Sequence, residues 1–313
     1  MEPLHITLGG RYTRDKKNGT LFTVNGAATN FTFEQTNNRF DPLAVLAFDV
    51  TSDVNVYAKY ATGYRAGGAS SRSLNYRAFG PESVQSYEVG IKSKFLDRKV
   101  RLNVAGYIMD RKDSQVDFNF YIPQQNGTIR NTLETVNAAG ITKIRGIEAE
   151  LTVKPVDRLS LGLSYAYTYT RVPPAQNTVQ EALNADGIPV FQEVFIVYTP
   201  ANALTGTIDY SLPIGSGSTE LRFHFDGNYA DPVYSFDNEP VLTEKSFIAN
   251  ARISLADIPM GAGGQKLTVA GWARNLFDTA YIYRRSAANF PTLGDYANYN
   301  APRTYGIDAT VNF

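Results

Sequence analysis

The amino-acid sequence predicts an all-β fold: an antiparallel, up-and-down transmembrane β-barrel to which this chain contributes about twelve strands. Three observations lead to this prediction. Apolar and polar residues alternate with a period of two along many segments, whereas helical periodicity is hard to find. Short and long connections alternate along the chain, and tyrosines gather where strands meet the long connections.

The composition is compatible with such a barrel and excludes several other classes of protein. The chain has 313 residues, of which 30 are basic and 30 acidic, and its net charge of zero gives no electrostatic reason to expect a nucleic-acid partner. The absence of cysteine excludes disulfides and thiolate metal sites, and two histidines leave almost no room for a histidine-built metal site. A mean hydropathy of −0.25 without a long apolar run excludes a helical membrane protein but allows a barrel.

The predicted strands begin at the N-terminus, where Leu4, Ile6 and Leu8 share one face of the segment 4–14. The clearest alternation runs through 158–171, with leucines and then tyrosines on one face and small or polar residues on the other. The further alternating segments are 43–51, 54–65, 83–95, 99–111, 143–154, 202–212, 219–230, 245–256, 265–277 and 304–313.

Alternation alone also fits a soluble sandwich with one solvated face, so strand length and connection length decide between the two folds. Several segments exceed the five or six residues usual in globular proteins and reach the nine to eleven that span a membrane. The connections at 51–53, 96–98, 155–157, 213–218 and 257–264 are short, and those near 15–40, 67–81, 114–142, 172–198, 231–244 and 278–301 are predicted to be long loops. Outer-membrane barrels show this asymmetry, with short turns on the periplasmic side and long loops outside.

Tyrosines support the same architecture. Tyr165, Tyr167 and Tyr169 fall at the long-loop end of their strand, and Tyr229 does the same in a later strand. A tyrosine at the edge of a membrane keeps its ring in lipid and its hydroxyl in water. The long-loop end is therefore predicted to lie at a membrane boundary.

Five short segments resemble TonB-dependent outer-membrane receptors, in order and across nearly the whole chain. Residues 83–93, followed by Phe95-Leu96-Asp97, resemble a barrel hairpin of that family, and 55–68 is similar to the strand before it. Similar matches follow at Asn137-Ala138-Ala139-Gly140 with Arg145-Gly146-Ile147-Glu148, at Asn275-Leu276-Phe277-Asp278 with Tyr281, and at Pro302-Arg303-Thr304-Tyr305-Gly306. The resemblance implies a barrel of about 22 strands, plugged by an N-terminal domain that contacts TonB, in the outer membrane of a Gram-negative bacterium.

The sequence departs from the family at its N-terminus. Residues 1–313 are interpreted as the barrel domain alone, truncated on its N-terminal side, with no plug domain, no TonB-contacting segment and no signal peptide. We therefore expect a fragment of a longer receptor that reaches TonB only through a missing plug and that misfolds or needs its missing half. The other expected partners are the outer-membrane lipid, the nutrient chelate and the barrel-assembly machinery, which in this family reads a terminal aromatic such as Phe313.

Two groups of residues are candidates for function. Glu220, Arg222, His224 and Asp226 share one strand face; we interpret them as a lumen wall of mixed charges rather than as a catalytic or metal site. Lys143, Arg145, Glu148 and Glu150 fit the same description, although Arg145 falls on the apolar parity and is expected near an interface. Candidate ligand contacts in the outer loops are Arg72, Tyr76, Phe118, Tyr121, Tyr234, Phe236, Arg284, Arg285, Tyr296 and Tyr299, because arginine and aromatic groups suit anionic or catecholate chelates.

The resemblance implies TonB-dependent uptake of a scarce nutrient, with a ferric-siderophore-like chelate as the favoured substrate and cobalamin, haem or oligosaccharide left open. The alternative is a passive, porin-like channel formed by a small closed barrel. A third hypothesis, an outer-membrane enzyme with a barrel body, is the least favoured, since the sequence shows neither a catalytic motif nor a cofactor motif.

Overall fold

A twelve-stranded antiparallel sheet dominates the computed structural model, which describes residues 3–24, 27–73, 76–123, 127, 129–179, 188–261, 263–286 and 295–313. Each strand pairs with its neighbours in chain order, which confirms the up-and-down topology and the number of strands predicted from alternation. The strands are β1 (Leu4–Val24), β2 (Ala27–Thr51), β3 (Val54–Arg65), β6 (Glu82–Phe95), β7 (Val100–Pro123), β8 (Ile129–Val153), β9 (Leu159–Arg171), β12 (Asn202–Pro213), β13 (Glu220–Ala230), β14 (Ser246–Met260), β15 (Gln265–Arg274) and β18 (Thr304–Asn312).

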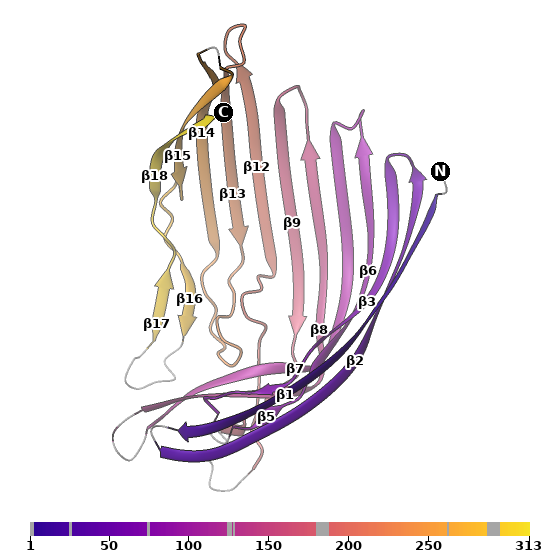
Figure 1. Cartoon of the computed structure of the whole chain (residues 1–313), viewed down its shortest axis with the longest axis vertical. Coiled ribbons are helices and arrows are strands. Elements are labelled where there is room, and N and C mark those ends of the chain that lie inside the picture. The colour runs from indigo at the N-terminus through magenta and orange to yellow at the C-terminus, as the bar shows by residue number, and fades with distance from the viewer. Residues whose placement is uncertain are drawn as a thin grey trace.

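The short turns and the long connections lie at opposite ends of the sheet (Figure 1). Three of the long connections contain small two-stranded sheets of their own. These pair β4 (Gly68–Ala69) with β5 (Ala78–Phe79), β10 (Ala175–Gln176) with β11 (Phe191–Gln192), and β16 (Ile282–Ser286) with β17 (Tyr296–Tyr299).

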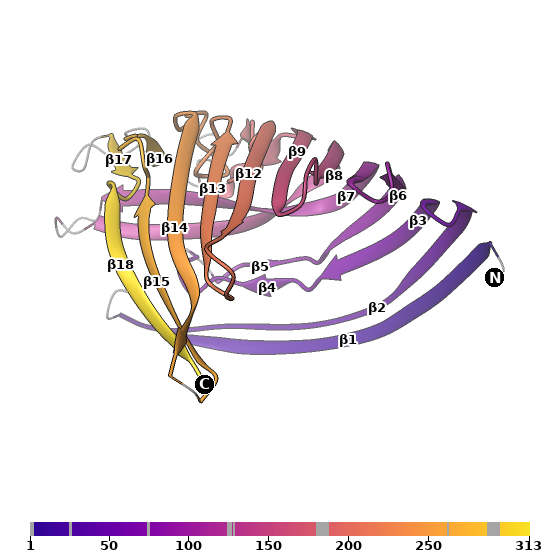
Figure 2. The same cartoon turned by 90° about the horizontal axis from the view of Figure 1, so that it is seen from above.

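The sheet forms an open arc in the view from above (Figure 2). β1 and β18 are its two edges, and among the described residues they are not paired with each other. The described part of the chain is therefore a curved barrel wall rather than a closed barrel.

Two of the predicted long loops are instead extensions of strands. β1 and β2 stay paired as far as Val24 opposite Ala27, and β7 and β8 as far as Pro123 opposite Ile129. In the β1–β2 extension polar side chains pair across the hairpin, as Lys16 does with Glu34 at 2.8 Å, and the apolar residues Val116 and Phe118 of the β7–β8 extension pack against other loops. Neither extension therefore carries the long apolar face that identifies a membrane strand. The sequence prediction of loops near 15–40 and 114–142 was wrong for this reason.

The β7–β8 hairpin bends where it leaves the regular sheet. The register shifts between Lys112 and Ser114, Asp113 has a φ of 54°, and Gly140 on the partner strand has a φ of 111°. The positive φ values of Asp113 and Gly140 accompany a β-bulge and a turn, which change the direction of the two strands. Beyond the bend the hairpin runs across the ends of the strands toward β14 (Figures 1 and 2).

The two faces of the main sheet differ in polarity, and large apolar side chains on one face remain exposed. Leu8 is 77% exposed, Val89 62% and Ile147 50%. A contiguous exposed apolar face of this kind is typical of a surface that meets lipid. The compact apolar core lies instead in the long connections, where Val116, Phe118, Ala138, Ala175 and Val194 are buried together. Within the described ranges, no helix is long and apolar enough to cross a membrane.

Candidate ligand-binding site and barrel wall

Three long connections pack into one platform at the long-loop end: the outer part of the β7–β8 hairpin, the β9–β12 connection and the β13–β14 loop. The backbone N–H of Asp117 donates to the Asp237 carboxylate at 2.9 Å, and the N–H of Phe195 donates to the Asp237 carbonyl at 2.8 Å. The buried cluster around Phe118 fills the space beneath these contacts. Apolar packing and charge-assisted hydrogen bonds together hold the loops in a defined arrangement.

Four of the predicted ligand contacts lie on the β13–β14 loop or on β16, which contacts this loop. Tyr234 stacks on Phe195 of the β9–β12 connection, with 3.8 Å between ring centroids. The guanidinium of Arg284 lies over the ring of Phe236, 5.1 Å from its centroid. The backbone N–H of Arg285 donates to the hydroxyl of Ser235 at 3.0 Å, which fixes β16 against this loop. Tyr234, Phe236, Arg284 and Arg285 thus form one surface, named the aromatic–arginine surface below.

The other predicted contacts are dispersed. Arg72 is exposed and donates to Asn119 on the β7–β8 hairpin at 3.4 Å, and Tyr76 packs edge-on against Phe33 of β2. Tyr296 and Tyr299 lie on β17, where Tyr299 is 63% exposed.

Two predicted contacts lie on β7. Phe118 is completely buried in the loop core, so its ring does not face a ligand in this structure. The backbone of Tyr121 pairs with Asn131, but its side chain falls outside the described part of the chain.

A cavity of about 400 Å³ lies beside the platform, with charged side chains in its wall. Arg65, Arg111, Asp117 and Asp237 line it together with the ring of Phe195. Burial raises the pKa of Asp237 to about 6, and the nearby Asp117 acts in the same direction, while the Asp117 N–H and the two arginines oppose the shift. Sequence reasoning missed Asp117 and Asp237, because only the fold brings residues this far apart together.

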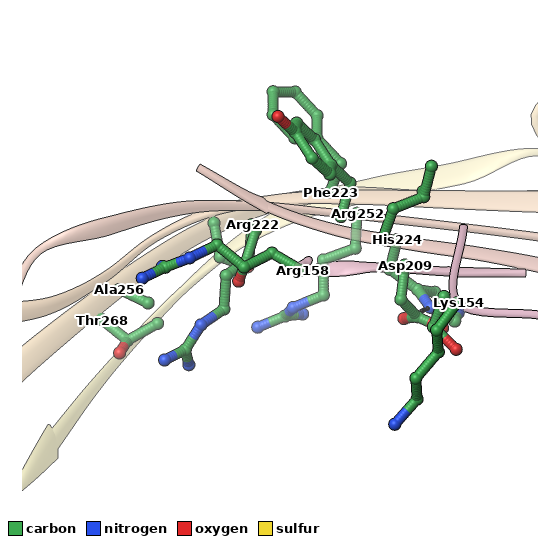
Figure 3. Close-up of a pocket in the computed structure, with 14 residues that line it drawn as sticks. Lys154, Arg158, Asp209, Arg222, Phe223, His224, Arg252, Ala256 and Thr268 are labelled. Atoms are coloured by element: carbon green, nitrogen blue, oxygen red, sulfur yellow. Dashed lines mark hydrogen bonds and ion pairs between the residues drawn. The ribbon is translucent and has the colours of Figure 1, made fainter. Parts of the chain in front are cut away.

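The charged residues predicted for the lumen wall form ion pairs within β13 and with both neighbouring strands. His224 contacts Asp209 of β12 at 2.7 Å and Asp226 at 3.4 Å. Arg222 pairs with Glu220 at 3.1 Å and also with Asp257. Asp209, Arg222 and His224 line a hollow of about 570 Å³ together with Arg158 and Arg252 (Figure 3). In this view Arg158, Arg222 and His224 project to one side of the sheet and Phe223 to the other.

This network matches a mixed-charge wall in its pairing. Each carboxylate has a cationic or hydrogen-bonding partner, as in the Arg158–Glu220 pair at 2.9 Å and the Arg252–Asp308 pair at 2.7 Å. Among the residues the structure describes, no group of three or more His, Asp or Glu side chains is arranged to hold a metal ion.

Lys143 requires a correction. The register places Lys143 opposite Arg171 and on the same face as Arg145. It does not lie on the face of Glu148, where it was predicted. Arg145 donates to Asp110 at 2.5 Å and to the carbonyl of Met109 at 2.6 Å. The terminal Phe313, the predicted assembly signal, is fully exposed and packs against nothing.

A sheet with one lipid-facing and one polar face, short turns at one end and packed loops at the other defines the wall of a membrane-spanning barrel with a loop-built outer surface. Residues 1–276 match the family described as TonB dependent receptor-like, beta-barrel, and the chain belongs to this family. Its members are transport receptors of the Gram-negative outer membrane, which is where this protein resides.

Individual relatives are distant. The chain is 27% identical over 322 residues to the ferric-pyoverdine M114 receptor PbuA of Pseudomonas sp. (strain M114), covering all of this chain and 34% of that protein. Among solved structures, it resembles the ferric yersiniabactin uptake receptor FyuA from Yersinia pestis, with a TM-score of 0.73, 17% identity and coverage of 99% of this chain and 43% of that one. It also resembles the copper transporter OprC, with a TM-score of 0.73, 13% identity and coverage of 99% and 46%. The chain thus spans about a third of its curated relative's length.

Proposed function

We propose that the chain supplies part of the barrel wall and the outer ligand-binding loops of a receptor for ferric-siderophore-like chelates. The observation that carries this proposal is the aromatic–arginine surface on a packed loop platform. Aromatic rings contact planar chelating groups, and guanidinium groups complement the negative charge of such chelates. The named substrates of PbuA and FyuA support this substrate class.

Transport in this proposal needs more than the described residues. In the part of the chain that the structure describes, the sheet has two unpaired edges, and a membrane offers no water to satisfy the backbone groups of an edge strand. We infer that the wall closes with further strands and that TonB drives transport through a plug domain, as the family relationship implies. Outer-membrane lipid and the barrel-assembly machinery are the remaining partners in the proposal.

The test replaces the stacked pair at the aromatic–arginine surface. Phe236→Leu and Arg284→Gln, each placed in the receptor as the cell produces it, should weaken binding of the cognate ferric chelate about tenfold. The matched control is Arg101→Gln, an exposed arginine at the short-turn end of β7. Binding of radioactive iron chelates to whole cells measures the effect, across a panel of catecholate, hydroxamate and mixed chelates.

The same panel tests the alternatives. Free copper belongs in it because OprC shares the fold. Uptake that is independent of TonB and unsaturable for all small solutes would favour a passive channel. Unchanged growth and uptake across the whole panel when the gene is deleted would reject the receptor proposal.

A further inference from the structure

The apolar face of the sheet carries a cluster of charges at its long-loop end. β7, β8 and β9 pair without a register shift up to this point, so Asp110, Lys143 and Arg171 lie directly beside one another on three adjacent strands. Lys112 lies two residues beyond Asp110 and therefore on the same face. The next row toward the membrane places Arg145 between Ile108 and Tyr169.

Most cationic side chains in this cluster have no ion-pair partner among the described residues. Arg145 already binds Asp110, at 2.5 Å, and none of the ion pairs among the described residues involves Lys112, Lys143 or Arg171. Lys143 lies directly opposite Arg171, and like charges at opposed positions destabilise strand pairing. An anion bound between the two side chains would remove this repulsion.

The bend of the β7–β8 hairpin leaves these cations accessible. The bulge begins directly after Lys112, and Gly140 turns the partner strand at the same level. The outer hairpin then runs across the strand ends instead of continuing along the apolar face (Figure 1). Lys112, Lys143 and Arg171 are all exposed.

An apolar groove lies on the same face, on the membrane side of the cations. It has a volume of about 630 Å³, within the usual range of ligand pockets. Ala44, Ala58 and Gly106 form its floor; a Cβ added to Gly106 would meet only the Gly146 carbonyl, at 3.9 Å. Its walls are large apolar side chains of five strands: Ile6, Leu8, Leu46, Tyr60, Tyr87, Val89 and Ile108. Since Ile108 lies two residues from Asp110 on the same face, the groove begins beside the cations.

We propose that the cations and the groove together bind a phosphorylated acyl lipid of the outer leaflet. The location of the family places this face in contact with lipid, and the long-loop end of such a barrel is its outer end. Ammonium and guanidinium groups bind phosphate, and the groove accepts an acyl chain. This inference rests on the membrane location and is independent of the transported cargo.

The test measures lipid binding to the chain as assembled in the outer membrane and extracted in a mild non-ionic detergent. Native mass spectrometry compares dimyristoylphosphatidic acid, dimyristoylphosphatidylcholine and inorganic phosphate as probes. Lys112→Gln/Lys143→Gln should lower the affinity for phosphatidic acid about 30-fold, since each cation near an anionic lipid surface contributes a factor of about five. The control, Lys94→Gln/Lys99→Gln, removes the same charge from two exposed lysines at the short-turn end and should leave the affinity unchanged.

A second variant separates the acyl chain from the head group. Gly106→Leu fills the groove and should weaken binding of phosphatidic acid while leaving the cations in place. Equal affinity for phosphatidic acid and phosphatidylcholine, or equal losses in both lysine pairs, would overturn the proposal. Full competition by inorganic phosphate would show that the cations bind a free anion instead of a lipid.

Discussion

At the residue scale, Asp237 makes the outer loops sensitive to pH. Its carboxyl group has a pKa of about 6 in the folded platform, above its ordinary value of 3.8 because of burial. A carboxyl whose folded pKa is raised binds its proton more tightly when folded, so loop docking loses stability as pH rises from about 4 to about 6 and stays constant above that. We predict that Asp237→Asn abolishes this loss and stabilises the docked loop at pH 7.5 by about 1 to 3 kcal/mol.

Hydrogen exchange of residues 231–244 at pH 5 and pH 7.5 measures this effect. The groups facing Asp237 are Asp117, Arg111 and Arg65, and none of them is altered in the variant. Asp237→Ala serves as the control: it removes the acceptor of the Asp117 N–H as well as the charge, so it should not stabilise the loop. Equal protection of the wild-type loop at both pH values would contradict the prediction.

Residue identity predicts only part of the candidate site. Arginines and aromatic residues in long loops are conspicuous in a sequence, and the structure brings Tyr234, Phe236 and Arg284 together. Phe118 belongs to the same residue class but fills the loop core, a difference that depends on how separate loops pack. The same packing buries Asp237, and local sequence carries no signal for it.

At the element scale, Asn137 holds the bend of the β7–β8 hairpin in place. Its side chain accepts the N–H of Gly80 at 2.6 Å and donates to the carbonyls of Gly80 and Asp113, at 3.0 and 2.9 Å. We predict that Asn137→Ala weakens docking of the outer hairpin by about 2 to 3 kcal/mol, because three partners lose their hydrogen bonds. Faster proteolysis within 114–138 is the measurement.

The control is Asn103→Ala in the regular part of β7, where the amide makes one long hydrogen bond to Glu150, at 3.4 Å. It should leave proteolysis of the outer hairpin unchanged. If Asn137→Ala and Asn103→Ala behave alike, the bend is held by strand pairing and not by Asn137.

Phe313 offers a second prediction at this scale. Because its side chain is fully exposed, deleting it removes no packing from β18. If it is an assembly signal, the deletion should lower the amount of protein in the outer membrane several-fold while the thermal stability of the purified protein stays unchanged. Normal membrane levels would reject the assembly role, and lowered stability would indicate a structural one.

The predictability of the strands also depends on their environment. Segments such as 158–171 are recognisable because lipid on one side and polar groups on the other enforce a period of two. The outer halves of β1, β2, β7 and β8 lack the long apolar face of a membrane strand. Polar side chains such as Lys16 and Glu34 pair across the first hairpin, and apolar residues of the second, such as Val116 and Phe118, pack against other loops. Twelve strands follow from the first pattern, whereas the folded-over hairpin could not be predicted.

At the scale of the whole molecule, the open sheet predicts how the isolated chain behaves. Within the described ranges, β1 and β18 each leave one side of their backbone unpaired, and each unpaired polar group in lipid costs several kcal/mol. A closed barrel resists detergent at room temperature and unfolds on boiling, so its gel migration changes with heating. We predict no heat-dependent shift for the isolated chain.

A polypeptide that adds enough further strands to join β18 to β1 should restore the shift. β1 runs toward the long-loop end and β18 runs away from it, so an even number of added strands keeps every pair antiparallel. An odd number would force one parallel pair and should fail. A heat-dependent shift of the isolated 313-residue chain would mean that β1 and β18 pair with each other, and the wall would then be a complete small barrel.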